Sequence, residues 1–328
     1  MATYYDIFGQ KVQYVTSDPP DSYVETGQIW YNSTSNELKG KVFLTSAVFT
    51  SGGALPVPRN FGAGGGASQN AAWIAGGGDG AGTNSNATYL YDGSSWSASG
   101  NMGTTRNRIS YGNSGPQTAG LAVGGFQPPG SIIANVEEFG GSTWTAGTNL
   151  PGGNQFHGGV GPQTANIVLG GGPTLPGTSS KEYDGSAWTA GGSTSEGFAY
   201  YGLAGADSGS CLAFYGGTSP AASNRGTGES YDGTSWTTVV PSLPSQRTSG
   251  QAIGTPTNAL FMGNSTTVNH WDGTSVSSQN AMSQPRGNGY IGGTATAGVT
   301  SGGSAPGPVT AVEEFSGVGA ETQTITTS

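Results

Sequence analysis

Short apolar runs recur along the chain, and each ends at a pair of glycines or a close variant of one. The runs occupy residues 72–75, 121–123, 167–169, 212–215 and 259–262, with a weaker sixth run at 297–301. Their first glycines are Gly76, Gly124, Gly170, Gly216, Gly263 (followed by Asn264) and Gly302, spaced 39 to 48 residues apart. Continuous apolar runs of this length between turn residues predict strands that are buried on both faces.

An aromatic residue follows each glycine pair after about a dozen residues. These aromatics are Tyr91, Phe139, Tyr183, Tyr231, Trp271 and Phe315. In most copies Asp-Gly or Gly-Gly comes next and then a tryptophan, as in residues 91–96, 183–188 and 231–236. Because Asp-Gly and Gly-Gly tolerate positive φ, this pattern predicts a tight hairpin in which the aromatic and the tryptophan meet across the strand pair.

A further strand precedes each apolar run, for example at residues 108–112, which gives about four strands per repeat. A fixed period of this length is typical of a repeat architecture, and four-stranded units repeated radially form a β-propeller. Helical periodicity with capping residues is found nowhere in the sequence. We therefore expect an all-β chain with six blades.

The apolar strand, the Gly-Gly pair, the spaced tyrosine and the later tryptophan resemble the kelch repeat. The resemblance spans about residues 46–315 and weakens in the last two copies, where Val276 replaces the tryptophan and none follows Phe315. It implies a kelch-like propeller whose glycine-ended strand lies second from the axis and whose tryptophan strand is outermost.

Residues 47–59 parallel residues 235–247, although no inner strands come before them. Such an isolated outer strand is expected to complete the final blade, with residues 46–52 as the closing strand. The alternative uses residues 322–327. Residues 28–42 are expected to form a hairpin, which is either half of a seventh blade or part of a separate module. We divide the chain into an N-terminal arm (1–45) and a propeller (46–328).

The segments 17–20, 27–34 and 38–39 resemble short segments of structural proteins of bacteriophages, especially tail-fibre proteins of marine phages. The resemblance implies a virion protein assembled in the host cytoplasm, with the N-terminal arm as the attachment module. We expect Tyr14, Trp30 and Tyr31 to be its attachment residues and other virion proteins to be its partners. Residues 1–6 lack the basic start and apolar stretch of a signal peptide, in agreement with this expectation.

Composition narrows the function. Glycine makes up 61 of 328 residues, charged residues make up 9%, and the formal net charge is −9. Sparse basic residues argue against nucleic-acid binding, and no apolar run approaches the length of a membrane span. Cys211 is the single cysteine, so no intrachain disulfide forms, and its apolar neighbours predict an inert buried thiol.

Catalytic and metal chemistry are not expected. His157 and His270 occupy different repeat positions, so we predict no metal site and no cofactor. The pairs Glu137-Glu138 and Glu313-Glu314 lie on strands, where neighbouring side chains point to opposite faces, so we expect solvated faces and not an acid-base dyad.

Four arginines precede the expected innermost strands: Arg59, Arg106, Arg247 and Arg286. Repetition predicts that they surround one rim of the central channel. There they either attract an anion, such as an acidic glycan group or a partner's carboxylate, or simply join the blades through local contacts.

The sequence favours a non-enzymatic virion structural protein, either a tail fibre or a capsid decoration. Loops at 78–86 and 217–221 are candidates for binding host-surface carbohydrate. A cellular kelch-type interaction scaffold is the first alternative, and a secreted carbohydrate-active enzyme is the second. The oligomeric state stays open.

Overall fold

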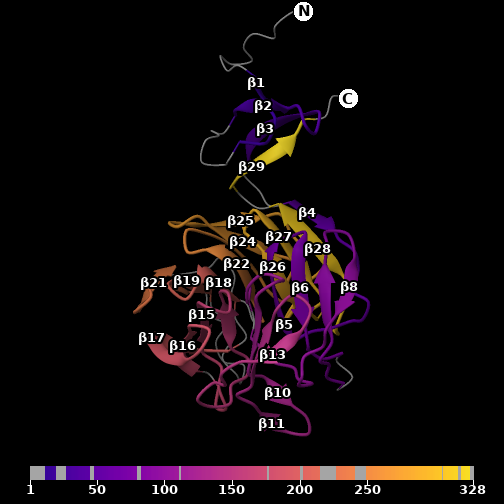
Figure 1. Cartoon of the computed structure of the whole chain (residues 1–328). Coiled ribbons are helices and arrows are strands. Elements are labelled where there is room, and N and C mark those ends of the chain that lie inside the picture. Colours follow the sequence, from indigo (N-terminus) through magenta and orange to yellow (C-terminus); the bar gives the residue numbers. More distant parts are fainter. Residues whose placement is uncertain are drawn as a thin grey trace, which may run out of the picture. The chain divides into compact units, whose positions relative to one another are not determined.

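The computed structural model describes residues 12–19, 27–44, 48–79, 83–110, 112–175, 177–199, 202–214, 227–240, 249–304, 306–316 and 319–325. Over these residues the chain forms β-strands and no helix. They belong to two compact units, drawn in Figure 1. Unit 1 comprises Met1–Ala47 together with Gly317–Ser328, and unit 2 comprises Val48–Ser316.

Unit 2 contains six antiparallel sheets among the described residues, numbered here along the chain. Sheet 1 is β5 (Ala63–Ser68), β6 (Ala71–Ala75), β7 (Thr88–Tyr91) and β8 (Trp96–Ser99); sheet 2 is β9 (Gly120–Val123), β12 (Val136–Phe139) and β13 (Trp144–Ala146); sheet 3 is β14 (Gly158–Val160), β15 (Asn166–Leu169), β16 (Gly177–Tyr183) and β17 (Trp188–Phe198). Sheet 4 is β18 (Gly202–Asp207), β19 (Ser210–Phe214), β20 (Gly228–Tyr231) and β21 (Trp236–Val240); sheet 5 is β22 (Gln251–Thr255), β23 (Asn258–Met262), β24 (Val268–Trp271) and β25 (Val276–Gln279); sheet 6 is β26 (Tyr290–Gly293), β27 (Ala297–Ser301), β28 (Val312–Ser316) and β4 (Val48–Ser51). A small hairpin, β10 (Phe126–Gln127) with β11 (Ser131–Ile132), follows β9.

The first strands of neighbouring sheets lie against one another. β5 contacts β26, β26 contacts β22, β22 contacts β18, and β18 contacts β14, while β9 lies against β5. Space between these strands is small: a Cβ on Gly292 of β26 would lie 2.5 Å from the carbonyl oxygen of Gly65 in β5. Glycine is therefore required where the sheets approach most closely, which explains much of the glycine in the first strands.

The cores of unit 2 lie between adjacent sheets, and the predicted apolar runs form them. Between sheets 3 and 4, for example, Leu169 packs with Leu203 and Ala213, all fully buried. The predicted hairpin aromatics also meet: the rings of Tyr183 and Trp188 are stacked with centroids 4.8 Å apart. Burying apolar area between flat sheets is the main favourable term in such a fold.

Sheet 6 takes its fourth strand from the beginning of unit 2. β4 pairs antiparallel with β28, so that Phe49 lies opposite Phe315. The expectation that residues 46–52 complete the last sheet is therefore confirmed for Val48–Ser51. The alternative strand at 322–327 is wrong, because β29 (Gly319–Thr324) pairs with β3 of unit 1.

Unit 1 is one four-stranded sheet, in the order β1 (Gln13–Val15), β2 (Ile29–Asn32), β3 (Glu37–Leu44) and β29. β1 and β2 are parallel, and the other pairs are antiparallel. The predicted hairpin at 28–42 is thus present in a sheet of its own and not in a seventh blade. This division differs from the predicted one near the end of the chain, where β29 pairs with β3 of unit 1.

Candidate functional site

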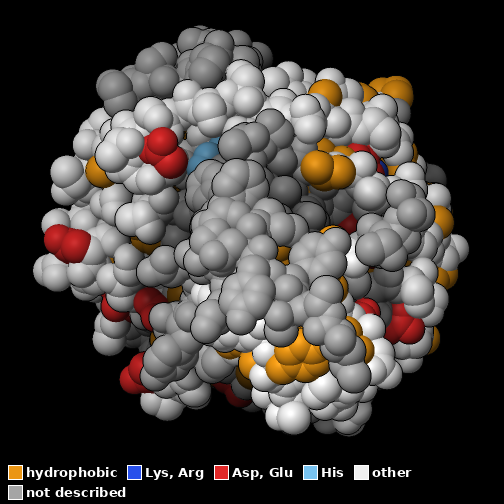
Figure 2. Space-filling view, turned by 90° about the horizontal axis from the view of Figure 1, so that it is seen from above, with side chains coloured by type: hydrophobic (Ala, Val, Ile, Leu, Met, Phe, Trp, Pro, Cys, Tyr) orange, Lys and Arg blue, Asp and Glu red, His pale blue; other side chains and the backbone are white. Residues whose placement is uncertain are grey.

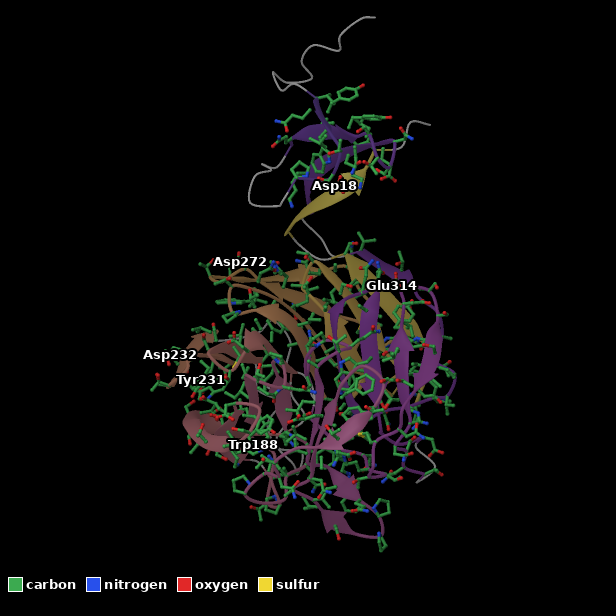
Figure 3. All side chains as sticks on the ribbon, viewed as in Figure 1. Asp18, Trp188, Tyr231, Asp232, Asp272 and Glu314 are labelled. Carbon is green, nitrogen blue, oxygen red and sulfur yellow. The ribbon has the colours of Figure 1, made fainter. Side chains whose placement is uncertain are left out.

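Tyrosine hydroxyls join three pairs of neighbouring sheets in unit 2. Tyr91 donates to Glu314 Oε1 (2.5 Å) and Tyr183 donates to Glu138 Oε1 (2.7 Å). Tyr231 donates to Glu182 in the same way. Figure 3 labels Tyr231 and Glu314 on their sheets. In each pair the tyrosine is the repeat aromatic of one sheet, and the glutamate directly precedes the repeat aromatic of the preceding sheet, namely Phe315, Phe139 or Tyr183.

Where the repeat aromatic of a sheet is not tyrosine, the residue at the glutamate position of the preceding sheet is apolar or neutral. Phe139, Trp271 and Phe315 take the aromatic position in sheets 2, 5 and 6, and the preceding sheets carry Leu90, Ser230 and His270 in place of the glutamate. The two positions therefore vary together along the chain. Burial first, and then the hydrogen bonds to Glu314 and Glu182, raise the pKa of Tyr91 and Tyr231 to about 12.

Arg106 and Arg286 do not form the predicted anion-binding rim, because both side chains are fully buried. Arg286 donates to Glu313 Oε1 (2.9 Å) and to the carbonyl oxygens of Gly302 and Ala311. Arg106 lies 3.3 Å from Glu137 Oε1 and donates to the carbonyl oxygens of Ala122 and Asn135. Each guanidinium therefore joins strands of a single sheet. The alternative that the sequence left open, in which the arginines join neighbouring blades, is not what these side-chain contacts do.

The glutamate partners correct a second expectation, since Glu137 and Glu313 are buried and not solvated. Glu137 also accepts from the Gly103 N–H (2.6 Å), and Glu313 accepts from the Ser283 N–H (3.0 Å). Arg59 is 9% exposed and lies over the ring of Tyr89, at 5.9 Å from its centroid. The fourth predicted rim residue, Arg247, lies outside the described residues.

A cavity of about 590 Å³ lies at one end of the first strands, and these arginines lie at the opposite end. All six repeats line it with equivalent small residues, namely Gly66, Gly115, Gly161, Gly205, Gly254 and Gly293 and the residue after each. Asn113 spans the cavity wall by donating to the carbonyl oxygens of Gly66 and Gly293 (both 3.0 Å). The lining residues include no ionisable side chain.

At the arginine end, five residues have positive φ although none is glycine. They are Phe61 (59°), Arg108 (54°), Phe156 (56°), Ser249 (59°) and Asn288 (56°), each two residues after the repeat position of the predicted arginines. Backbone hydrogen bonds connect them between sheets: Asn288 N–H donates to Ser249, Phe61 N–H to Asn288, and Phe156 N–H to Arg108. We call these five residues the collar.

Three collar side chains meet one another. The rings of Phe61 and Phe156 form an edge-to-face pair with centroids 5.9 Å apart. The Arg108 guanidinium carbon lies 4.8 Å from the centroid of Phe156 and 4.6 Å from that of Phe126. Sequence reasoning missed Arg108, although its place two residues after Arg106 was a usable signal once the repeat had been aligned.

In unit 1, Asp18 holds the N-terminal strand against β2 and β3. Its carboxylate accepts from Trp30 Nε1 (3.0 Å), Asn32 Nδ2 (2.9 Å) and Lys39 Nζ (2.7 Å), and these hydrogen bonds, that of Lys39 first, lower the pKa of Asp18 to about 2. Figure 3 labels Asp18.

Of the three predicted attachment residues, Trp30 is fully buried and so is a core residue. Tyr14 is 79% exposed and lies beside Tyr31, with ring centroids 5.0 Å apart. The structure therefore brings two of the three together, on the strand pair β1–β2.

Two other predicted residues lie inside unit 2. Cys211 is fully buried, and burial raises the pKa of its thiol, which agrees with the prediction of an inert side chain. His157 is fully buried, and burial, reinforced by the charge of Lys181, lowers its pKa to about 3. His270 forms a hydrogen bond with Asn258 Oδ1 (2.7 Å) within sheet 5, whereas His157 directly precedes β14 of sheet 3. The two histidines therefore do not lie at one site.

The surface drawn in Figure 2 is mostly neutral. Asp and Glu side chains lie there as separate spots, and Lys or Arg hardly shows. Within the described residues, no group of three His, Cys, Asp or Glu side chains is close enough to hold a metal ion. Over the same part of the chain, no helix has the length and apolar character of a membrane span.

No protein-family model matches the sequence, and no curated protein matches it. Among solved structures, 310 chains match. One of these, described as "Structure of YjhT", gives a TM-score of 0.64 at 16% sequence identity and covers 83% of this chain and 99% of that chain. A likeness at this identity shows the fold alone, a propeller-like all-β arrangement of four-stranded sheets.

Proposed function

We propose that this chain is a non-enzymatic structural protein of a bacteriophage particle, either a tail fibre or a capsid decoration. In this proposal unit 2 is a six-bladed kelch-like propeller displayed on the outside. Unit 1 is the attachment module, which binds another virion protein. The displayed propeller binds host-surface glycan or a neighbouring virion protein.

The observation that carries this proposal is an exposed tyrosine, Tyr14, which lies beside the half-buried Tyr31 on a separate sheet. Unit 1 gathers strands from both ends of the chain, so the sheet is anchored at β29 and at β3 while β1 lies at its edge. Tyr14 is on this edge strand and is 79% exposed, the largest exposure among the large hydrophobic side chains described. An exposed tyrosine on an edge strand is a common basis for binding another protein.

The propeller assignment draws on two further observations. The first strands of successive sheets lie side by side, and one cavity is lined from all six sheets. A radial arrangement explains both, because it brings equivalent residues of every repeat to one axis.

Electron microscopy of purified particles with a labelled antibody against unit 2 tests the proposal. We expect the label at one defined place on the particle. The variant Tyr14→Ala should lower incorporation into particles, while Val57→Ala, which shortens an exposed side chain of unit 2, should leave it unchanged. Unlabelled particles, with the protein found only in the host cytoplasm, would contradict the proposal and favour a cellular scaffold.

A further inference from the structure

Arg108 carries a positive charge without a carboxylate partner. Among the described residues its polar contact is a hydrogen bond from Nη1 to Gln155 Oε1 (3.2 Å), and no ion pair joins it to a described Asp or Glu. Arg106 and Arg286, by contrast, are each paired with a buried glutamate. Arg59 also has no ion pair with a described carboxylate, but it is only 9% exposed, whereas Arg108 is half-buried. In a chain whose formal net charge is −9, an accessible arginine without a carboxylate partner favours an anionic ligand.

The position of this guanidinium is fixed before any ligand arrives. It lies between the rings of Phe126 and Phe156, and Gln155, which is 8% exposed, holds one of its nitrogens. An arginine that is held in one orientation loses little side-chain entropy on binding, and its planar N–H groups match a carboxylate. Arg108 itself is half-buried, so part of its side chain is accessible.

The backbone of the collar is costly in energy, and it recurs in five repeats. A left-handed backbone costs roughly 1–2 kcal/mol for a residue other than glycine. This chain has 61 glycines, yet phenylalanine, arginine, serine and asparagine take these places. Side chains are therefore retained at equivalent collar positions of five repeats.

Asn288 supplies a second and independent observation. It is 9% exposed, and its Oδ1 finds no hydrogen-bond partner among the described residues. A buried amide oxygen without a partner costs free energy that a ligand hydroxyl would recover. Ser249, the collar neighbour whose carbonyl oxygen accepts from the Asn288 N–H, adds a half-buried hydroxyl.

From this arrangement we infer that the collar is a binding site for an acidic sugar, with the carboxylate on Arg108 and hydroxyls on Asn288 and Ser249. One guanidinium among neutral amides and hydroxyls suits a singly charged carboxylate better than a doubly charged phosphate. The inference deepens the proposed function, on which its biological setting rests, by naming the ligand class and the place where the glycan binds.

The test is isothermal titration calorimetry of the full chain with glucuronate, and with glucose and acetate as separate probes. We expect glucuronate to bind at least tenfold more tightly than either. Arg108→Met should weaken glucuronate binding at least tenfold. Asn288→Asp adds a negative charge beside the bound carboxylate at nearly constant side-chain shape, so it should also weaken glucuronate binding at least tenfold. This variant replaces Arg108→Met in the test if Arg108→Met does not fold.

Arg59→Met is the matched control, because it removes the same groups two residues before the collar and should leave binding unchanged. Three results would overturn the inference: no binding of glucuronate, equal binding of glucose or acetate, or an equal loss in Arg59→Met. Binding of a glutamate-rich peptide in the absence of glucuronate binding would overturn it as well. None of these results bears on the particle labelling that tests the proposed function.

Discussion

The hydrogen bond between Tyr183 and Glu138 provides a direct test of how the sheets of unit 2 are joined. Tyr183 is 1% exposed, and its hydroxyl donates to Glu138 Oε1 at 2.7 Å and accepts from the Thr148 N–H at 3.3 Å. A hydrogen bond to a charged group contributes about 1.5–3 kcal/mol. Glu138 is half-buried and water can replace part of the bond, so we expect about 1.5 kcal/mol for Tyr183→Phe.

The chain itself supplies the replacement pair. Sheets 1 and 2 carry Leu90 and Phe139 at the positions that Glu138 and Tyr183 take in sheets 2 and 3. Glu138→Leu should also cost about 1.5 kcal/mol, since it leaves the tyrosine hydroxyl without its acceptor. The double variant should lose about 2 kcal/mol and not 3, which gives a coupling energy of about 1 kcal/mol.

Urea unfolding of the full chain, followed by tryptophan fluorescence, measures these values, and thermal melting should show a decrease of about 2–3 °C for each single variant. Tyr89→Phe is the control. It removes a tyrosine hydroxyl for which the structure gives no hydrogen bond, and it should change stability by less than about 0.5 kcal/mol. Additive losses in the double variant, or an equal loss in Tyr89→Phe, would refute the contact.

Three further predictions concern charge. The pKa of His157 in the folded state is about 3, below its ordinary value. The free energy of unfolding should therefore be highest above about pH 6.5 and fall by about 1.4 kcal/mol per pH unit toward pH 3. Urea unfolding at several pH values should show a smaller fall for His157→Ile. The pKa of Tyr91 is raised to about 12, so stability should be lost as the pH rises from about 10 to 12, and Tyr91→Phe should lose less over that range. Arg286→Met should destabilise the protein by about 3–5 kcal/mol by leaving Glu313 buried and unpaired, whereas Arg286→Met with Glu313→Leu should recover part of the loss in the same urea assay.

Much of the fold could be predicted because its determinants are local in sequence. The apolar runs, the Asp-Gly turns and the spaced aromatics fixed the strands and hairpins of each repeat. The turn at 92–95 illustrates the mechanism, since Asp92 Oδ1 accepts from the N–H groups of Ser94 (2.8 Å) and Ser95 (2.7 Å). The parallel between residues 47–59 and 235–247 even located the closing strand β4.

The charged positions were harder to predict, because the environment of an arginine depends on strands distant in the sequence. Arg106 and Glu137 meet only when the loop before sheet 2 folds over β9 and β12. The sequence shows four similar arginines. It does not show which of them are buried and paired with a glutamate, and such arginines cannot bind a ligand. Arg108 became a candidate only through its φ of 54° and its place between two aromatic rings.

The amino-acid pattern by itself determined the repeat, its strands and its turns, because backbone conformation and apolar spacing act over a few residues. Tertiary structure alone decided that β29 joins the N-terminal sheet, that Trp30 is core, and that two predicted rim arginines are buried. Pairing between distant strands and the burial of charge depend on which surfaces meet, and that information is spread over the whole chain.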